Sequence, residues 1–398
     1  MENSKKLSYK AVTFLGILAF FFGTAMRFDT LLSVLPIVDD IYINNVATVG
    51  FVVTALGLIV FGIMGDKLPP IKMITAAILG GALINILLSF FTNIYIISVL
   101  LCLNAIFYSM LLPALIRFFS EQVSDEKYFG TVAKVNILGL AATIILLTAI
   151  PKIINAISLR NTLYIIAGLG LAVFFVWFFM CKNIKIGKAI AYEETLKNDK
   201  PASVLRLILF AGLIPVFLVL IVEGCLRNGI VSWLPNLAYD MFDIEKSSVI
   251  SSVIVPALGI IGVGLAAVIY KKLKHEIKTA TIMWLVALLS LIVLILDLDM
   301  PHLTVVCVPL VLIGVYGANF VLIFLMPKKF KSYGKVSAFA GIFSAFSYIG
   351  VAFSNIFFTK VVEEESWGLV LVYCFLLAVF GFLAFAVKIK SWTKFINK

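Results

Sequence analysis

The chain has 398 residues, of which 62% are hydrophobic and 13% charged, with a formal net charge of +11 and a mean hydropathy of +1.12. A water-soluble protein needs a polar exterior that this composition does not supply, so soluble globular and disordered classes are excluded. We expect an integral membrane protein whose exterior is covered largely by lipid.

Apolar stretches of about 20 residues, the length that spans a bilayer as a helix, follow one another along the sequence. The first is too long for a cleaved signal peptide and has no small-residue cleavage site, so we expect it to remain as a helix. In the first half we predict helices over residues 11–38, 45–65, 72–91, 94–119, 129–152 and 160–182. In the second half we predict helices over residues 205–235, 247–270, 278–297, 301–326, 335–359 and 366–388.

One long polar segment interrupts this pattern in the middle of the chain and contains Glu193, Glu194 and Asp199. It predicts a six-helix bundle over residues 1–182, a cytoplasmic linker over 183–204 and a second six-helix bundle over 205–398. The expected fold is an all-α membrane protein with twelve transmembrane helices in two pseudo-symmetric bundles, as in secondary transporters.

The placement of Lys and Arg predicts the orientation. Most of the 32 basic residues fall in loops on the side of the termini, whereas the opposite loops hold few and are instead acidic. The basic residues of those opposite loops are Lys152, Arg160, Lys246 and Lys360. The positive-inside rule therefore predicts a multi-pass protein of the cytoplasmic (plasma) membrane with both termini in the cytoplasm. The same placement explains the net charge without a nucleic-acid partner.

The five cysteines are isolated, and both histidines, His275 and His302, fall in predicted loops. No spacing matches a disulfide framework, a metal site or a catalytic set. We expect no enzyme activity, no cofactor and no metal, and a monomer whose partners are the lipid bilayer and a small anionic solute.

Two arginines lie inside predicted membrane helices, where a charge costs at least about 2.5–3.5 kcal/mol and marks a functional candidate. Arg27 falls in the first helix and Arg227 in the seventh, followed at similar distances by Pro36 and Pro235. Matching positions in two halves predict that the arginines face each other and bind one anion, because guanidinium groups present paired donors to phosphate or carboxylate oxygens.

In a second interpretation, the charge of Arg227 is neutralised by a residue of the protein itself. Glu223 precedes it by four residues and shares its helical face, so it is a candidate counter-ion, proton carrier or selectivity group. Asp29 lies only two residues from Arg27 and would need another partner. Asn319 and Tyr348 are candidate donors into a central cavity; alternatively, each packs between helices.

The string FGIMGDKLPP ends the second predicted helix and contains Gly62, Gly65, Asp66 and Lys67. It resembles the G-x-x-x-D-R/K loop signature of major facilitator transporters. The resemblance implies that Asp66 caps and locks neighbouring cytoplasmic helix ends, and the alternative is an ordinary turn.

The string LRNGIVSWLP, from Leu226 to Pro235, resembles the seventh-helix signature of the organophosphate:phosphate antiporter family within the major facilitators. The matching residues are Arg227, Gly229, Trp233 and Pro235. The resemblance implies that Arg227 is one of a pair that binds a phosphoryl group, with Arg27 as its first-helix counterpart. Residues 340–350 also resemble the eleventh helix of bacterial members.

Two positions depart from the family members that exchange glycerol 3-phosphate. Gly139 stands where they carry a histidine, and Leu58 stands where they carry a lysine. The paired arginines and the family resemblance together predict a secondary active transporter that moves a small organic anion, with a phosphate ester favoured, by alternating access. Two alternatives stay open: a proton-coupled transporter of another carboxylate, sugar or drug, and a sensor that binds a phosphorylated ligand without moving it.

Overall fold

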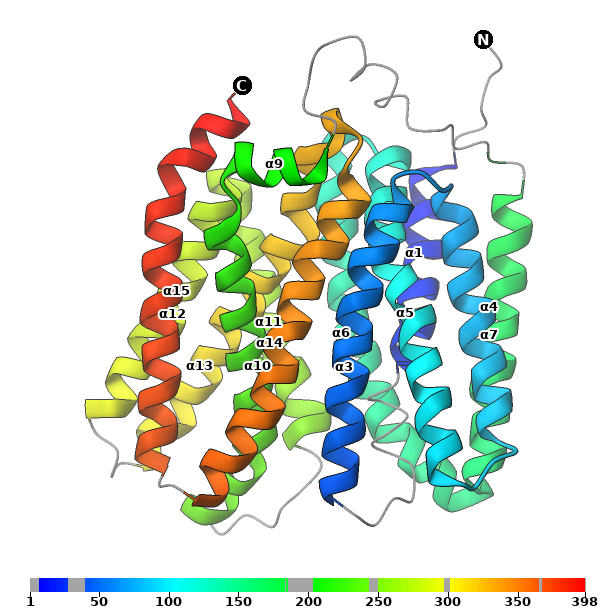
Figure 1. Ribbon diagram of the computed structural model, residues 1–398, viewed down its shortest axis with the longest axis horizontal. Helices are drawn as coiled ribbons and strands as arrows, with labels where there is room; N and C mark the ends of the chain where they lie inside the picture. Colours follow the sequence, from blue (N-terminus) through cyan, green and yellow to red (C-terminus); the bar gives the residue numbers. More distant parts are fainter. Residues whose placement is uncertain are drawn as a thin grey trace. The chain divides into compact units, whose positions relative to one another are not determined.

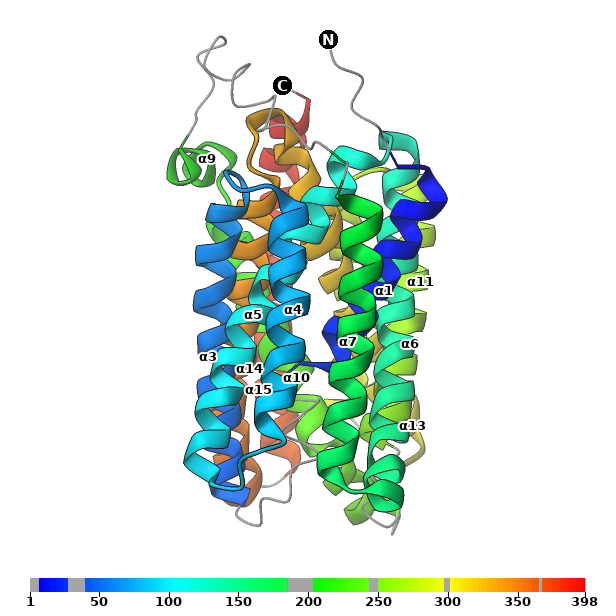
Figure 2. The same cartoon turned by 90° about the vertical axis from the view of Figure 1, so that its right-hand side faces the viewer.

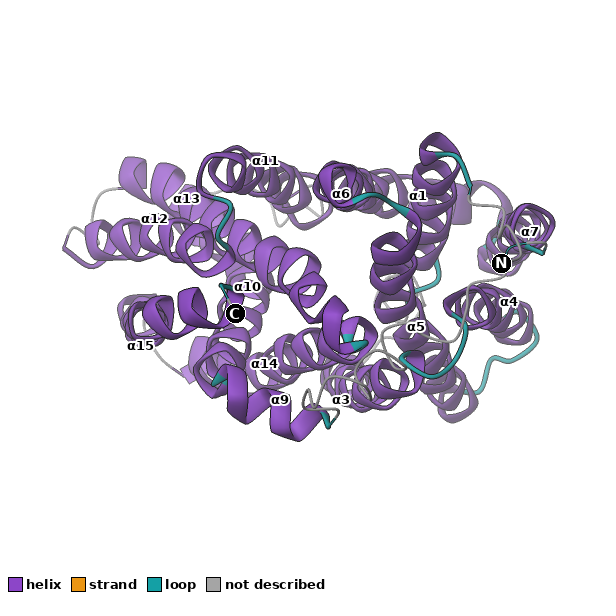
Figure 3. Cartoon of the chain, turned by 90° about the horizontal axis from the view of Figure 1, so that it is seen from above, coloured by secondary structure: helices purple, strands orange, loops and turns teal. Residues whose placement is uncertain are grey.

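The computed structural model describes residues 7–27, 40–182, 184, 203–242, 250–296, 301–364 and 367–397. These residues form helices and contain no strand (Figure 3). Eleven helices among them are long and apolar enough to cross a membrane, and α1 (Tyr9–Ala25) is a shorter apolar helix. The predicted all-α class is confirmed, and a twelve-helix membrane fold fits these elements.

The chain divides into two compact units, each described here by itself. Unit 1 holds Met1–Ala202 and Pro327–Ala345, and unit 2 holds Ser203–Met326 and Phe346–Lys398. The first boundary falls in the segment predicted as a linker. Residues 327–345, which the sequence pattern places in the second bundle, belong to unit 1 by their contacts.

Unit 1 contains α1 and the five helices that follow it (Figure 1). These five are α3 (Asp40–Gly65), α4 (Pro70–Leu88), α5 (Ile94–Gln122), α6 (Asp125–Ile157) and α7 (Leu159–Cys181). Helix α4 packs against α5 and α7, α3 packs against α5, and α1 packs against α6 (Figure 2). Asn93 begins α5 as an N-cap, since its Oδ1 accepts the Tyr95 N–H at 2.9 Å.

Unit 2 contains most of the remaining helices. They are α9 (Val204–Ala211), α10 (Ile214–Phe242), the π-helix η1 (Ile250–Ile254), α11 (Val255–Leu273), α12 (Glu276–Leu296), α13 (Pro301–Phe320), the π-helix η2 (Val321–Leu325) and α15 (Trp367–Ile396). The 3₁₀ helix η3 (Met326–Tyr333) leads into α14 (Val336–Glu364), whose first part belongs to unit 1 and whose remainder belongs to unit 2. Helix α12 packs against α13 and α15, and α10 packs against α15.

The first predicted helix, over residues 11–38, is wrong at its C-terminal end. Helix α1 ends at Ala25, because the last turn tightens and the Arg27 N–H bonds the Thr24 carbonyl three residues back. The apolar sequence continues past this point, so hydropathy alone did not show where the helix ends. Residues 28–39 lie outside the described part of the chain.

The seventh predicted helix, over 205–235, is instead two helices. Gly212 adopts the left-handed conformation (φ +58°, ψ +51°) and its N–H bonds the end of α9, a conformation that costs glycine little because it has no Cβ. Helix α9 lies crosswise at the end of α10 (Figure 1). Helix α10 then continues to Phe242, seven residues beyond the predicted end.

Candidate functional site

The predicted pair of charges on α10 is formed in unit 2. Four residues are slightly more than one helical turn, so Glu223 and Arg227 share a face, and Arg227 Nε lies 2.9 Å from Glu223 Oε1. The Glu223 side chain is fully buried, whereas 24% of the Arg227 side chain is exposed. The pairing matches the interpretation in which Glu223 is the counter-ion.

Ser347, on α14, completes the coordination of the carboxylate and was not a sequence candidate. Its hydroxyl donates to Glu223 Oε2 at 2.7 Å and accepts from Arg227 Nη2 at 3.4 Å. Both oxygens of the buried carboxylate are therefore hydrogen-bonded, as a buried charge requires. Among the described residues, Arg227 Nη1 has no hydrogen-bond partner, which leaves one edge of the guanidinium available.

Two tyrosines surround the same guanidinium. The Arg227 Cζ atom lies 5.7 Å from the centroid of the Tyr316 ring, within the range of a cation–π interaction. Tyr348, a sequence candidate, lies near the same cation on α14 and is half-buried. Asn319, the other polar candidate, is half-buried on α13 and has no hydrogen-bond partner among the described residues.

Close packing of α10 against α14 brings these groups together. A Cβ atom added to Gly224 would collide with the Ser347 carbonyl, and one added to Gly350 would collide with the Ile221 carbonyl. Small residues of this kind allow the backbones of membrane helices to approach closely. One residue beyond Arg227, Asn228 Nδ2 donates to Ser354 Oγ at 3.2 Å across the same interface.

Arg27 lies two residues beyond α1 rather than within a helix, which corrects its predicted position. Its side chain is half-buried in unit 1. Asp29 lies outside the described residues, so its predicted role stays untested. Gly229 is buried within α10. Trp233 and Pro235 fall within the bounds of α10, but the predictions for their side chains lie outside the described part.

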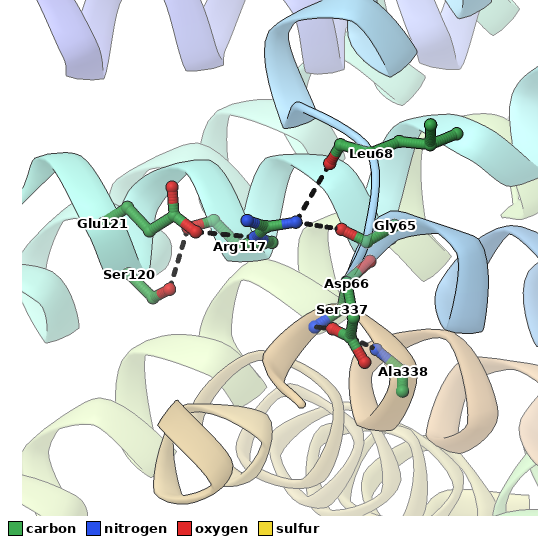
Figure 4. A network of polar contacts seen from close by, with 8 residues as sticks. All are labelled: Gly65, Asp66, Leu68, Arg117, Ser120, Glu121, Ser337 and Ala338. Atoms are coloured by element: carbon green, nitrogen blue, oxygen red, sulfur yellow. Dashed lines mark hydrogen bonds and ion pairs between the residues drawn. The ribbon is translucent and has the colours of Figure 1, made fainter. Parts of the chain in front are cut away.

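A second polar network in unit 1 is built around Asp66 (Figure 4). Asp66 Oδ1 accepts the N–H groups of Ser337 at 3.0 Å and Ala338 at 3.2 Å. The carboxylate thus occupies the positive N-terminal end of α14. Burial raises the pKa of Asp66 to about 7, against the opposing effects of Lys335, whose Nζ lies 3.9 Å from Oδ2, and of the two N–H groups.

The other residues of the same loop signature divide into two groups. Gly62 and Gly65 allow α14 to approach, because a Cβ at Gly62 would lie 3.0 Å from the Gly341 Cα and one at Gly65 would collide with the Ser337 hydroxyl. Lys67 is exposed and forms no ion pair among the described residues. The cation beside Asp66 is therefore Lys335, from a distant part of the sequence.

Arg117 is a member of this network that the sequence analysis missed. Its side chain is 5% exposed, and Nε lies 2.6 Å from Glu121 Oε1. Its Nη1 donates to the Gly65 carbonyl, and to the Leu68 carbonyl at 3.0 Å (Figure 4). A cation at the C-terminal end of α3 complements the helix dipole and satisfies carbonyls that the helix leaves unpaired. The spacing of Arg117 and Glu121 was the available signal.

The fold and these two networks define a multi-pass helical membrane protein with buried charges of the kind that transporters carry. The family model of the Major Facilitator Superfamily matches residues 13–355, and the chain belongs to this superfamily. It is therefore a membrane transporter by family. No curated protein matches the chain in sequence.

Solved structures of transporters share the fold. The chain is similar to a Major Facilitator Superfamily transporter, FucP, in the outward conformation, with a TM-score of 0.70, 12% identity and coverage of 95% of this chain and 98% of that chain. It is also similar to a bacterial homologue of the iron transporter ferroportin in an outward-facing state. That comparison gives a TM-score of 0.64, 13% identity and coverage of 98% of this chain and 99% of that chain.

Proposed function

We propose that this chain is a secondary active transporter that moves a small organic anion, with a phosphate ester as the favoured substrate class, by alternating access. The observation that carries the proposal is the Arg227 guanidinium, which is partly exposed, surrounded by tyrosines and unpaired at Nη1 among the described residues. A guanidinium fork matches the oxygens of a phosphate or carboxylate group. Arg27 is proposed as the second anion-binding group.

Glu223 has a defined part in this proposal. A lone arginine in apolar surroundings is costly, and a buried carboxylate at 2.9 Å offsets that cost while no substrate is bound. An incoming anion then competes with Glu223 for the same cation. This competition favours an anion with enough charge or hydrogen-bonding capacity to attract the guanidinium, and it disfavours neutral solutes.

A thermal-shift screen of the detergent-solubilised protein tests the substrate class. Glucose 6-phosphate and glycerol 3-phosphate are each compared with glucose and glycerol, because a ligand that binds only the folded protein raises its melting temperature. We expect a shift with the esters alone, reduced in Arg227→Lys, since lysine keeps the charge but loses the fork. Arg206→Lys, on the exposed face of α9, is the matched control. Equal shifts with neutral sugars, or full shifts in Arg227→Lys, would contradict the proposal.

Proton-coupled transport is the second candidate, and the buried Glu223 specifically favours it. Protonation of that carboxylate would release Arg227, so the binding of a proton at Glu223 would control whether Arg227 is available to a substrate. Uptake into proteoliposomes with and without an imposed pH gradient separates the two candidates. Uptake that depends on the pH gradient, with this dependence lost in Glu223→Gln, supports proton coupling. Exchange that does not depend on the gradient supports anion antiport.

The proposed location is the cytoplasmic membrane, with both termini in the cytoplasm and the protein as a monomer. The basic residues in the last turn of α11, Lys271 and Lys272, fit the orientation because cytoplasmic helix ends are rich in Lys and Arg. Reporter fusions to each terminus test the orientation, and light scattering in detergent tests the monomer.

A further inference from the structure

A cavity of about 620 Å³ opens beside the ends of α4 and α7 in unit 1, and its lining includes neither Asp66 nor Arg117. Its volume is within the range of small-molecule sites. Most of the lining is apolar, including Ile71, Ala76 and Phe178, and two lysines, Lys72 and Lys182, also line it. The lining contains no carboxylate. A ligand with an apolar body and a negative end would complement these walls.

The positive charge of this cavity has three sources. Lys72 and Lys182 are exposed, and neither forms an ion pair among the described residues. Helix α4 begins here with Pro69 as N-cap and Pro70 in the first turn, and this turn contains no acidic residue. The positive end of the α4 dipole is therefore added to the two ammonium groups. These charges favour an anion, and most of the positive charge comes from the two lysines rather than from the helix end.

The cavity lies where the apolar helices end. The span of α4 begins at Pro70, and the span of α7 ends at Cys181, so the lysines mark the edge of the hydrocarbon layer. The neighbouring face of α7 exposes 52% of Phe175, 47% of Phe178 and 60% of Phe179. Exposed aromatic side chains on a membrane helix contact acyl chains or the interface. The site therefore has one end at headgroup level and one end in lipid.

We propose that this cavity binds an anionic phospholipid, with the headgroup phosphate at Lys72 and Lys182 and an acyl chain along Ile71 and Phe178. The predicted orientation places the site in the cytoplasmic leaflet, which is the leaflet that carries anionic lipid. Basic pockets between transmembrane helices on that side suit such headgroups. The bound lipid would hold the ends of α4 and α7 together, and it is separate from the transported solute.

The first test measures lipid binding to the purified full-length protein in detergent. Phosphatidylglycerol and phosphatidylcholine are added separately, and melting temperature and lipid retention in native mass spectrometry are recorded. We expect phosphatidylglycerol alone to raise the melting temperature and to be retained. Lys72→Gln/Lys182→Gln should bind it about 30-fold more weakly, the effect of removing two lysines near an anionic surface. The matched control, Lys271→Gln/Lys272→Gln on the exposed end of α11, should bind it as the unmodified protein does.

A second variant distinguishes the cavity from general surface charge. Ala76→Trp fills the cavity from an exposed position while both lysines remain, and it should also lose lipid retention. Equal losses in the two lysine pairs, or full retention in Lys72→Gln/Lys182→Gln or in Ala76→Trp, would overturn the proposal. A glycerol phosphate shift that is lost in Lys72→Gln/Lys182→Gln would assign the site to free phosphate esters and overturn the lipid assignment.

Discussion

Glu223→Gln removes a buried negative charge from beside Arg227 and keeps the size of the side chain. In the structure that carboxylate lies 2.9 Å from Arg227 Nε and accepts the Ser347 hydroxyl at 2.7 Å. An anion bound at the open edge of the guanidinium would lie about 6–7 Å from the carboxylate, where like charges repel by about 2.5 kcal/mol at an effective dielectric constant of about 20. We therefore expect Glu223→Gln to bind anions about 10- to 100-fold more tightly.

The same substitution should weaken the fold. Removing one partner of a buried ion pair costs about 3–5 kcal/mol, and the partial exposure of Arg227 places the expected cost at or below the lower end. Isothermal titration with glucose 6-phosphate measures affinity, and thermal unfolding measures stability. Ser347→Ala is the matched control: it removes the two hydrogen bonds of the hydroxyl, each worth about 1 kcal/mol, and keeps the charge of Glu223, so anion affinity should change little. Weaker anion binding by Glu223→Gln would refute the competition between Glu223 and substrate.

Three further predictions concern stability. Burial raises the pKa of Asp66 from its ordinary value of 3.8 to about 7, so between these pH values the folded protein holds a proton that the unfolded chain has lost. Stability should therefore fall as pH rises from about 4 to about 7. Asp66→Asn should flatten this melting-temperature profile, and an unchanged slope would contradict the assignment. Asn104→Leu should raise the free energy of unfolding by about 1–3 kcal/mol, since both polar atoms of Asn104 are buried without a partner in the described chain. A loss of stability in Asn104→Leu would show that the amide is satisfied in the folded protein. Gly212→Ala should lower the free energy of unfolding by about 1 kcal/mol, because Gly212 has a positive φ that alanine adopts at a cost. Gly264→Ala, with open space around the added Cβ, should not lower it. Equal effects of the two substitutions would reject this conformational argument.

The sequence predicted those features that depend on local pattern. Continuous hydropathy identified the membrane helices, and the helical period placed Glu223 beside Arg227. The same hydropathy concealed the break at Gly212, because a left-handed residue changes the direction of the chain without making it polar. The end of α1 at Ala25 was concealed in the same way.

The missed features depend on residues distant in sequence. Ser347 is one of several serines on an apolar helix, and only the packing of α10 against α14 brings it to Glu223. Arg117 was not a candidate, because it lies near the end of the helix predicted over residues 94–119, yet it is buried against the end of α3. The capping of α14 by Asp66 joins residues about 270 positions apart, which no local spacing could show.

Transport by the reconstituted protein tests the central claim most directly. Uptake of radiolabelled glucose 6-phosphate and glycerol 3-phosphate is measured in proteoliposomes that contain the unmodified chain, Arg27→Lys, Arg227→Lys or the control Arg206→Lys. We predict accumulation by the unmodified chain and the control, and its loss in both Arg27→Lys and Arg227→Lys. Undiminished uptake of these anions by the two site variants would contradict the proposal that their guanidinium groups bind the transported solute.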